Sequence, residues 1–278
     1  MLQTESLIVI LNISQWTARK HDKKITDEVK ESHNASEDAG RYNKLLISKV
    51  HMEDIAKVSS RARAFHYENT LPWGDNNERL LPTKNYMKYI GEMSVMKSEF
   101  DHAVSMFFKN YDAVIDEARV RLNGMFRESD YPSKNEIQDK FAFITTFMPV
   151  PTSDIRVSLE NDEVDSIRKS VESEIATRLN SAISNIWDRV KDQLVKVKDR
   201  MSSENNIFRD SLFENIREIT ELIPSLNVTN DSNINEVCEK MKSLIYDPEM
   251  VRNDANLRKE VLNETDKILD TFTNFFKQ

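Results

Sequence analysis

The stretch VDSIRKSVESEIATRLNSAISNIWDRVKDQLVKVKDRM, residues 164–201, decides the fold class. Its apolar positions recur every three or four residues, at Val164, Ile167, Val171, Ile175, Leu179, Ile183, Ile186, Val190, Leu194, Val197 and Met201. Ten steps over 37 residues give a mean spacing of about 3.7, close to the helical period and to an eleven-residue repeat. The stretch therefore predicts one continuous helix of about 55 Å with a coiled-coil-like seam buried against other helices.

A helical hairpin is expected upstream of this seam. Apolar residues recur at helical spacing in residues 41–68 and again, with many aromatic side chains, in residues 84–126. Between them, residues 70–82 (TLPWGDNNERLLP) contain two prolines and a Trp-Gly pair, which ends a helix. Two helices joined by a loop of about a dozen residues predict an antiparallel hairpin.

The remaining segments predict shorter elements. Residues 6–16 alternate and are β-branched, which favours a strand or a pairing arm, and residues 154–159 are the candidate strand to pair with it. Further helices are expected at residues 135–143, 207–223, 234–246 and 248–276. The predicted fold is thus mainly α, a long helical hairpin plus an extended helix bundle, with at most a small two-stranded β element. The expected regions are 1–150 and 151–278.

Composition restricts the function. The chain has 278 residues, 31% of them charged, and only 4 glycines, none of which stands in a GxGxxG or GxxxxGK[ST] spacing. Both common nucleotide-binding loops are therefore missing. The net charge of −8 is uneven: residues 1–127 sum to +1, 128–200 to −3 and 201–278 to −6. This balance argues against a protein that coats nucleic acid with its whole surface.

The single cysteine, Cys238, has no internal partner and lies on an apolar helix face, which indicates a reducing compartment. Residues 7–11 are apolar but lack the flanks of a signal peptide, and no window approaches the roughly 20 apolar residues needed to cross a bilayer. A cytoplasmic protein without a membrane segment is expected.

Catalytic and metal signals are weak. The five histidines form no pair at i, i+3 or i+4, and Glu99-x-x-His102 occurs once where a carboxylate-bridged bundle needs two such pairs. No GxSxG elbow is present. We therefore expect no metal, no cofactor and no catalytic residue; an enzyme of unrecognised type is the least favoured interpretation.

Two groups of residues are candidate binding surfaces. Arg19, Lys20, Lys23 and Lys24, with Arg61 and Arg63, could bind phosphate, and Trp16 could stack a base or dock a partner; the alternative is that the charges are solvated and the aromatics form core. In the loop, Pro72 and Trp73 are either a plug over the hairpin or a docking point, and the plug is favoured.

Several motifs together resemble an uncharacterised family of helical proteins from bacteriophages and integrative mobile elements. They are ISQWTARK (13–20), NTLPWG (69–74), RLLP (79–82), Phe100-Asp101, Tyr111-Asp112, DYPS (130–133), PVP (149–151) and Arg156-Val157. The likeness covers about residues 6–195, and relatives read Trp-Thr-Gly-Arg where this chain has Ala18. The resemblance implies no active site, and it associates the chain with ring-forming ATPases and DNA recombination.

The expected function is therefore that of a phage or mobile-element interaction protein, active in the bacterial cytoplasm without catalysis. Its partner would be a host or phage protein, including a ring-forming ATPase, and the seam predicts a homo-oligomer. The alternative is a DNA-associated accessory protein that uses the basic N-terminal face; nucleic acid is the less favoured partner.

Overall fold

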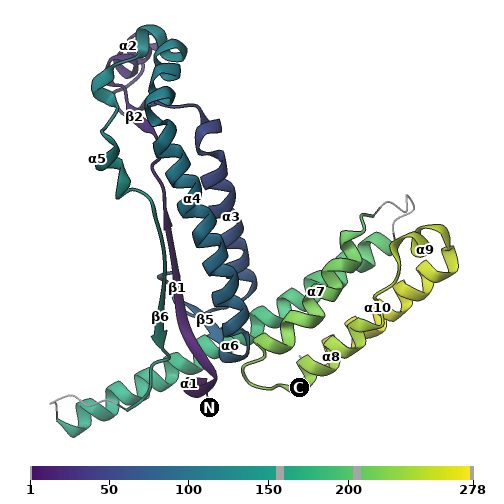
Figure 1. Ribbon diagram of the computed structural model, residues 1–278. Helices are drawn as coiled ribbons and strands as arrows, with labels where there is room; N and C mark the ends of the chain where they lie inside the picture. Colours follow the sequence, from purple (N-terminus) through teal and green to yellow (C-terminus); the bar gives the residue numbers. More distant parts are fainter. Residues whose placement is uncertain (1, 155–159, 203–207, 276–278) are drawn as a thin grey trace. The chain divides into compact units, whose positions relative to one another are not determined.

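The computed structural model describes residues 2–154, 160–202 and 208–275 and is mainly helical (Figure 1). The described helices are α1 (Leu2–Glu5), α2 (Lys23–His33), α3 (Glu53–Glu68), α4 (Thr83–Leu122), α5 (Lys134–Gln138), α6 (Asn161–Ser202), α7 (Ser211–Leu226), α8 (Ser232–Lys242), α9 (Pro248–Asn253) and α10 (Ala255–Phe275). Short 3₁₀ turns lie at η1 (Lys49–Met52), η2 (Asn123–Met125) and η3 (Glu128–Asp130).

The described strands form two sheets. They are β1 (Ser6–Ser14), β2 (Arg19–His21), β3 (Asn43–Leu45), β4 (Leu71–Pro72), β5 (Arg79–Pro82) and β6 (Ala142–Pro149). One sheet has the order β4-β5-β1-β6, with β5 antiparallel to β1 and to β4, and the other is the antiparallel pair β2-β3. The expectation of at most two strands is wrong, because short strands gain their hydrogen bonds from partners far away in the sequence.

The long helices confirm the periodic patterns. α4 covers the expected segment 84–126 almost completely, and α6 runs unbroken through the seam. The seam is buried only from Ala182 onward; within α6 as described, no residue from 161 to 181 is buried, and Ile183 is half-buried against the core. The prediction of a buried seam is therefore correct for the C-terminal half of α6 and wrong for the N-terminal half.

Other expectations need correction. Residues 41–52 are not α-helical but contain β3 and the 3₁₀ turn η1, and residues 142–149 form β6 where a helix to residue 143 was expected. The helix expected from 248 to 276 is divided into α9 and α10 at Asp254, while Pro224 lies inside α7 rather than after it. The candidate strand at 154–159 lies outside the described residues beyond Asp154.

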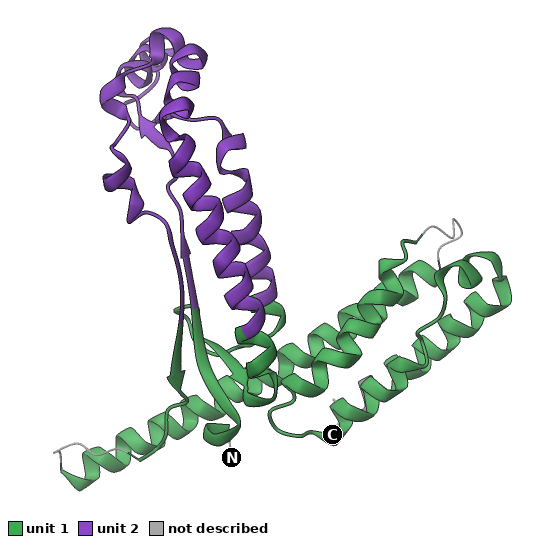
Figure 2. Cartoon of the chain, in the orientation of Figure 1, with its two compact units in different colours: residues 1–10, 66–90, 146–278 green, residues 11–65, 91–145 purple. Residues whose placement is uncertain are grey.

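The chain divides into two compact units (Figure 2). Unit 1 comprises residues 1–10, 66–90 and 146–278, and unit 2 comprises residues 11–65 and 91–145. The expected regions 1–150 and 151–278 do not follow this division, since the first 150 residues contribute to both units. The chain passes from one unit to the other four times, within β1, α3, α4 and β6.

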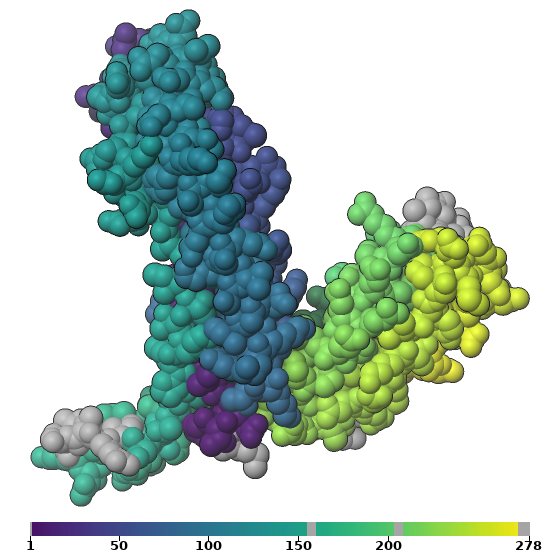
Figure 3. All heavy atoms as spheres, viewed as in Figure 1, coloured from purple at the N-terminus to yellow at the C-terminus, as the bar shows by residue number. Residues whose placement is uncertain are grey.

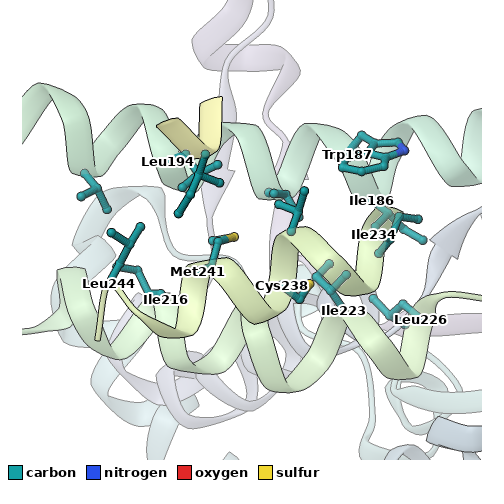
Figure 4. Packing of buried hydrophobic residues seen from close by; sticks show 14 of the residues in the cluster. Ile186, Trp187, Leu194, Ile216, Ile223, Leu226, Ile234, Cys238, Met241 and Leu244 are labelled. Carbon is teal, nitrogen blue, oxygen red and sulfur yellow. The ribbon is translucent and has the colours of Figure 1, made fainter. Parts of the chain in front are cut away.

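Unit 1 has its core between α6, α7, α8 and α10. Ile186 and Leu194 of α6 point toward α8, where Ile234 and Met241 lie (Figure 4). In the space-filling view the side chains of α7 to α10, coloured green to yellow, pack without visible gaps (Figure 3). Cys238 is fully buried here, and burial raises the pKa of its thiol to about 12, so it stays protonated. The expected burial of this cysteine is confirmed.

Unit 2 has a core of aromatic side chains on α4. Phe100 packs against Phe143 of β6, and Phe107 packs against Tyr111 and Phe141. The aromatic side chains of residues 84–126 are thus covered in part by β6 and the segment before it.

Candidate functional site

A cleft with a volume of about 900 Å³ lies in unit 2 between α3 and α4. Residues of η1 and α3 form one wall and residues of α4 form the other. The lining residues are Val50, His51, Asp54, Ile55, Lys57, Val58, Arg61, Ser98, Glu99, His102, Ala103, Met106, Phe107, Asn110 and Val114. Their three- and four-residue spacing on both helices follows from the helical period, which places them on the facing sides of the hairpin.

The floor of the cleft is apolar and buried. Ile55, Phe107 and Val114 are at most 5% exposed, whereas Met106 and Val50 at its edges are 42% and 61% exposed. An exposed apolar rim next to a buried apolar floor is typical of a surface that binds another protein.

Two side-chain contacts join the walls of the cleft. Arg61 of α3 bonds Glu99 of α4, and His51 Nε2 lies 2.8 Å from Glu117 Oε2. His51 and Arg61 are ten residues apart, about 15 Å along η1 and α3, whereas Glu99 and Glu117 are 18 residues apart, about 27 Å along α4. The two contacts therefore mark a segment long enough for about three to five turns of a bound helix.

The cleft offers no described metal site. His102 and Glu99 both line it, but the described residues contain no group of three or more His, Cys, Asp or Glu side chains placed to hold a metal ion.

A buried ion cluster fixes the segment that carries the basic tract. Lys44 Nζ lies 3.1 Å from Asp22 Oδ2 and 2.7 Å from Asp130 Oδ2, and it donates to the Met125 carbonyl oxygen at 2.8 Å. Burial works against the charges of Lys44 and Asp22. The hydrogen bonds outweigh it, so the pKa of Lys44 is raised and that of Asp22 is lowered. Asp22 also caps α2 by accepting from the Ile25 amide at 3.3 Å.

The basic candidates are arranged around this cluster. Arg19 and Lys20 are exposed on β2, and Lys23 and Lys24 are exposed at the start of α2. Lys20 lies 3.9 Å from Asp130, and Lys24 lies 3.7 Å from Glu28. Part of the expected phosphate-binding charge is thus paired within the chain.

The other two basic candidates make contacts of their own on α3. Arg61 pairs with Glu99 across the cleft, and Arg63 donates to the Ile13 carbonyl oxygen at 2.8 Å. Both guanidinium groups therefore have a contact within the chain, and neither belongs to the exposed basic tract of residues 19–24.

Trp16 lies on the surface of the aromatic core of unit 2. It is half-buried, and its ring centroid lies 6.4 Å from that of Phe107 and 6.1 Å from that of Tyr111. Two residues later, Ala18 has φ 50°, a left-handed conformation that glycine adopts more easily. Glycine would adopt this conformation without the strain that the Cβ of Ala18 causes.

Trp73 is buried in the core of unit 1. It is 5% exposed within the cluster that contains Leu71, Leu80 and Ile186, and its buried Nε1 has no hydrogen-bond partner among the residues that the structure describes. Pro72 is half-buried in β4. These positions favour the plug over the docking interpretation, because the Trp73 side chain is not presented to a partner.

Two arginines close the C-terminal end of α3 beside this plug. Arg189 donates to the carbonyl oxygens of Tyr67, Glu68 and Thr70 at 2.6 to 2.8 Å, and Arg79 donates to that of Thr70 at 2.9 Å. Cations at a helix C-terminus are stabilised by the unpaired carbonyls there. Burial and the neighbouring Arg189 lower the pKa of Arg79 to about 10.

The most perturbed histidine is next to this clamp. His66 is 3% exposed, and its Nδ1 lies 2.7 Å from the Tyr89 hydroxyl. Burial, with the nearby Arg79, lowers the pKa of His66 to about 4, and burial raises the pKa of Tyr89. Both groups are neutral at pH 7, so the pair is a structural hydrogen bond rather than an acid-base pair working near neutrality.

Comparison with known proteins adds no assignment. No family model, curated protein or solved structure matches the chain. No described helix is both long enough and apolar enough to cross a membrane.

Proposed function

We propose that the chain is a helical interaction protein that acts without catalysis, by binding an amphipathic helix of a protein partner in the cleft between α3 and α4. The observation that carries this proposal is the apolar floor of that cleft between the Arg61–Glu99 and His51–Glu117 contacts. A helix that lays its apolar face into such a groove buries surface that Met106 and Val50 now expose to water.

The rim defines the polar side of the partner. Asp54 and Lys57 stand on the α3 wall and Asn110 on the α4 wall. A partner helix with charges of both signs beside its apolar face can pair with this rim. An anionic polymer is attracted by Lys57 but repelled by Asp54. The resemblance to phage and mobile-element proteins further suggests a partner in the bacterial cytoplasm, for which a ring-forming ATPase is one candidate, and a chain that works as an oligomer.

Binding of DNA through the basic N-terminal face is the second candidate, supported by the exposure of Arg19 and Lys23. Charge weighs against it: unit 2 contains 18 basic and 18 acidic residues, and unit 1 contains 21 and 29. Phosphate binding gains its free energy from cations that are not already neutralised.

The experiment places a photo-crosslinking amino acid at Met106 of the full chain in its native host cells. Val95, an exposed apolar residue of α4 outside the cleft lining, is the matched control position. We expect one nuclease-resistant adduct from position 106 only, identified by mass spectrometry and then purified.

The purified partner should bind the full chain, and Met106→Asp should weaken binding at least ~10-fold while Val95→Asp leaves it unchanged. No adduct at 106, the same adduct at 95, or equal binding by both variants would reject the cleft as the binding site. An adduct removed by nuclease would favour the DNA alternative.

A further inference from the structure

The N-terminal half of α6, residues 161–181, carries an apolar stripe that the described residues of unit 1 bury only in part, with Ile175 packed against the edge of the core. In Figure 1 this half extends, in teal, away from the helices α7, α8 and α10 that cover the buried half. The stripe consists of Val164, Ile167, Val171, Ile175 and Leu179, of which Ile167 is 39% exposed and the others are half-buried.

The stripe has the geometry of a helix-pairing seam. At 100° per residue its five side chains fall within an arc of about 120°, and they continue in line with Ala182 and Ile186, which are fully buried in the core cluster of unit 1. The apolar repeat is thus covered by other parts of the chain in the C-terminal half of α6, whereas in the N-terminal half it contacts only the edge of the core.

We propose that this stripe pairs with the same stripe of a second copy of the chain, antiparallel, about a two-fold axis near Val171. This pairing is separate from the cleft in unit 2, since it uses another unit and another surface.

The charges beside the stripe are self-complementary in this arrangement. Residues on the same flank of the two helices meet when the pair is antiparallel. Arg168 and Glu172 share one flank, so each Arg168 faces Glu172 of the second copy, twice by symmetry. On the other flank, Glu163 faces Arg178 of the second copy in the same way.

The first turn of α6 favours the antiparallel direction. Asp162, Glu163 and Asp165 form an acidic end. Parallel pairing would bring the acidic ends of both copies together, whereas antiparallel pairing places each beside Arg178 of the other copy. Within the chain Arg168 contacts Asp165 at 2.7 Å and the Ser153 carbonyl oxygen at 3.4 Å, and Arg178 contacts Glu174 at 2.6 Å and Glu78 at 3.4 Å, so the second copy would share these guanidinium groups with the contacts they already make.

The size of the interface sets its strength. About 20 residues of each helix take part, and such a pair lies at or below the ~1,200 Å² of stable complexes, so the dimer is expected to be weak and concentration-dependent. Sedimentation velocity of the full chain should show a monomer-dimer equilibrium in the micromolar range.

Two variants test the charge pairing. In a dimer of Arg168→Glu, two carboxylates meet wherever residue 168 of one copy faces residue 172 of the other. In a dimer of Glu172→Arg, two guanidinium groups meet at the same contact. Each variant alone should be monomeric up to ~100 µM, and an equimolar mixture should dimerise, because every contact then joins opposite charges. Circular dichroism melts of both variants check that the fold is kept.

A cysteine placed on the axis tests the register. Oxidation of Val171→Cys should give a covalent dimer, while Lys169→Cys, outside the stripe, should not; Cys238 is buried and does not compete. A monomeric wild-type chain at ~100 µM, failure of the mixture to associate, or equal crosslinking at both positions would overturn the proposal. The cleft experiment is independent, since a dimer through α6 gives no adduct at Met106.

Discussion

Replacement of Lys44 by methionine should open the part of unit 2 that contains β2, β3 and α2. Its ammonium group holds Asp22 and Asp130, whose side chains are only 4% and 11% exposed. Lys44→Met keeps the length of the side chain and leaves two buried carboxylates without their main partner. Removing one member of a buried ion pair costs about 3–5 kcal/mol.

The lower end of that range applies here, because the ammonium group of Lys20 lies 3.9 Å from Asp130 and still compensates part of that carboxylate's charge. A loss of about 3 kcal/mol in the free energy of opening makes amide exchange about 100-fold faster. Hydrogen exchange measured by mass spectrometry on peptides within residues 19–45 gives this number directly, without requiring that the two units unfold together.

The effect of Lys44→Met should depend on pH in a direction set by the pKa of Asp22. The pKa of Asp22 is lowered in the folded chain, so its stabilisation is present above about pH 3.8 and is lost as the pH falls through the folded pKa. The difference between Lys44→Met and the wild type should therefore shrink as the pH falls below about 4. Lys24→Met, which removes an exposed pair on α2, is the control and should change exchange little. Equal exchange rates in the two variants would refute the assignment of Lys44 as the centre of this cluster.

Four further predictions concern single side chains. The pKa of His66 is lowered to about 4 from 6.5, so unit 1 should lose about 3 kcal/mol of stability between pH 6.5 and 4. In an NMR titration the imidazole signals of His66 should not shift above about pH 5.5. Trp73→Ala should destabilise unit 1 by about 3–5 kcal/mol in urea denaturation without changing partner binding. Arg189→Met should cost about 2 kcal/mol in the same assay, since it removes hydrogen bonds to three carbonyl oxygens at the end of α3, of which Arg79 still donates to those of Tyr67 and Thr70. Ala18→Gly should raise the stability of unit 2 by about 1 kcal/mol in thermal melts, because glycine relieves the left-handed strain.

The sequence predicts the long helices well because their signal is local. Each turn of α4 and α6 repeats the same apolar spacing, so the evidence accumulates over 40 and 42 residues. The strands β5 and β6 have no such repetition. β5 has four residues, ends at Pro82 and takes its register from β1, more than 70 positions earlier, so pairing rather than propensity determines it.

The candidate site could be predicted only in part. Periodicity indicates that α3 and α4 form a hairpin, but the cleft depends on which faces of the two helices meet, and Met106 has no feature that distinguishes it from a core methionine. Trp73 was predictable as a special residue, since a Trp between Pro and Gly in a loop needs a reason. Its burial follows from the position of α6, which is about 110 residues away in the chain. The Lys44 cluster gave no signal, because its three charged groups are scattered over more than 100 residues.

The four passages of the chain between the two units have a consequence for dissecting the protein. Each passage lies inside a helix or strand, at residues 10–11, 65–66, 90–91 and 145–146, rather than in a loop. A truncation at any of these points would cut through a hydrogen-bonded element and leave new backbone ends without partners. Limited proteolysis should consequently cleave elsewhere, and a fragment that represents one unit must be built by joining segments through designed turns instead of by shortening the chain.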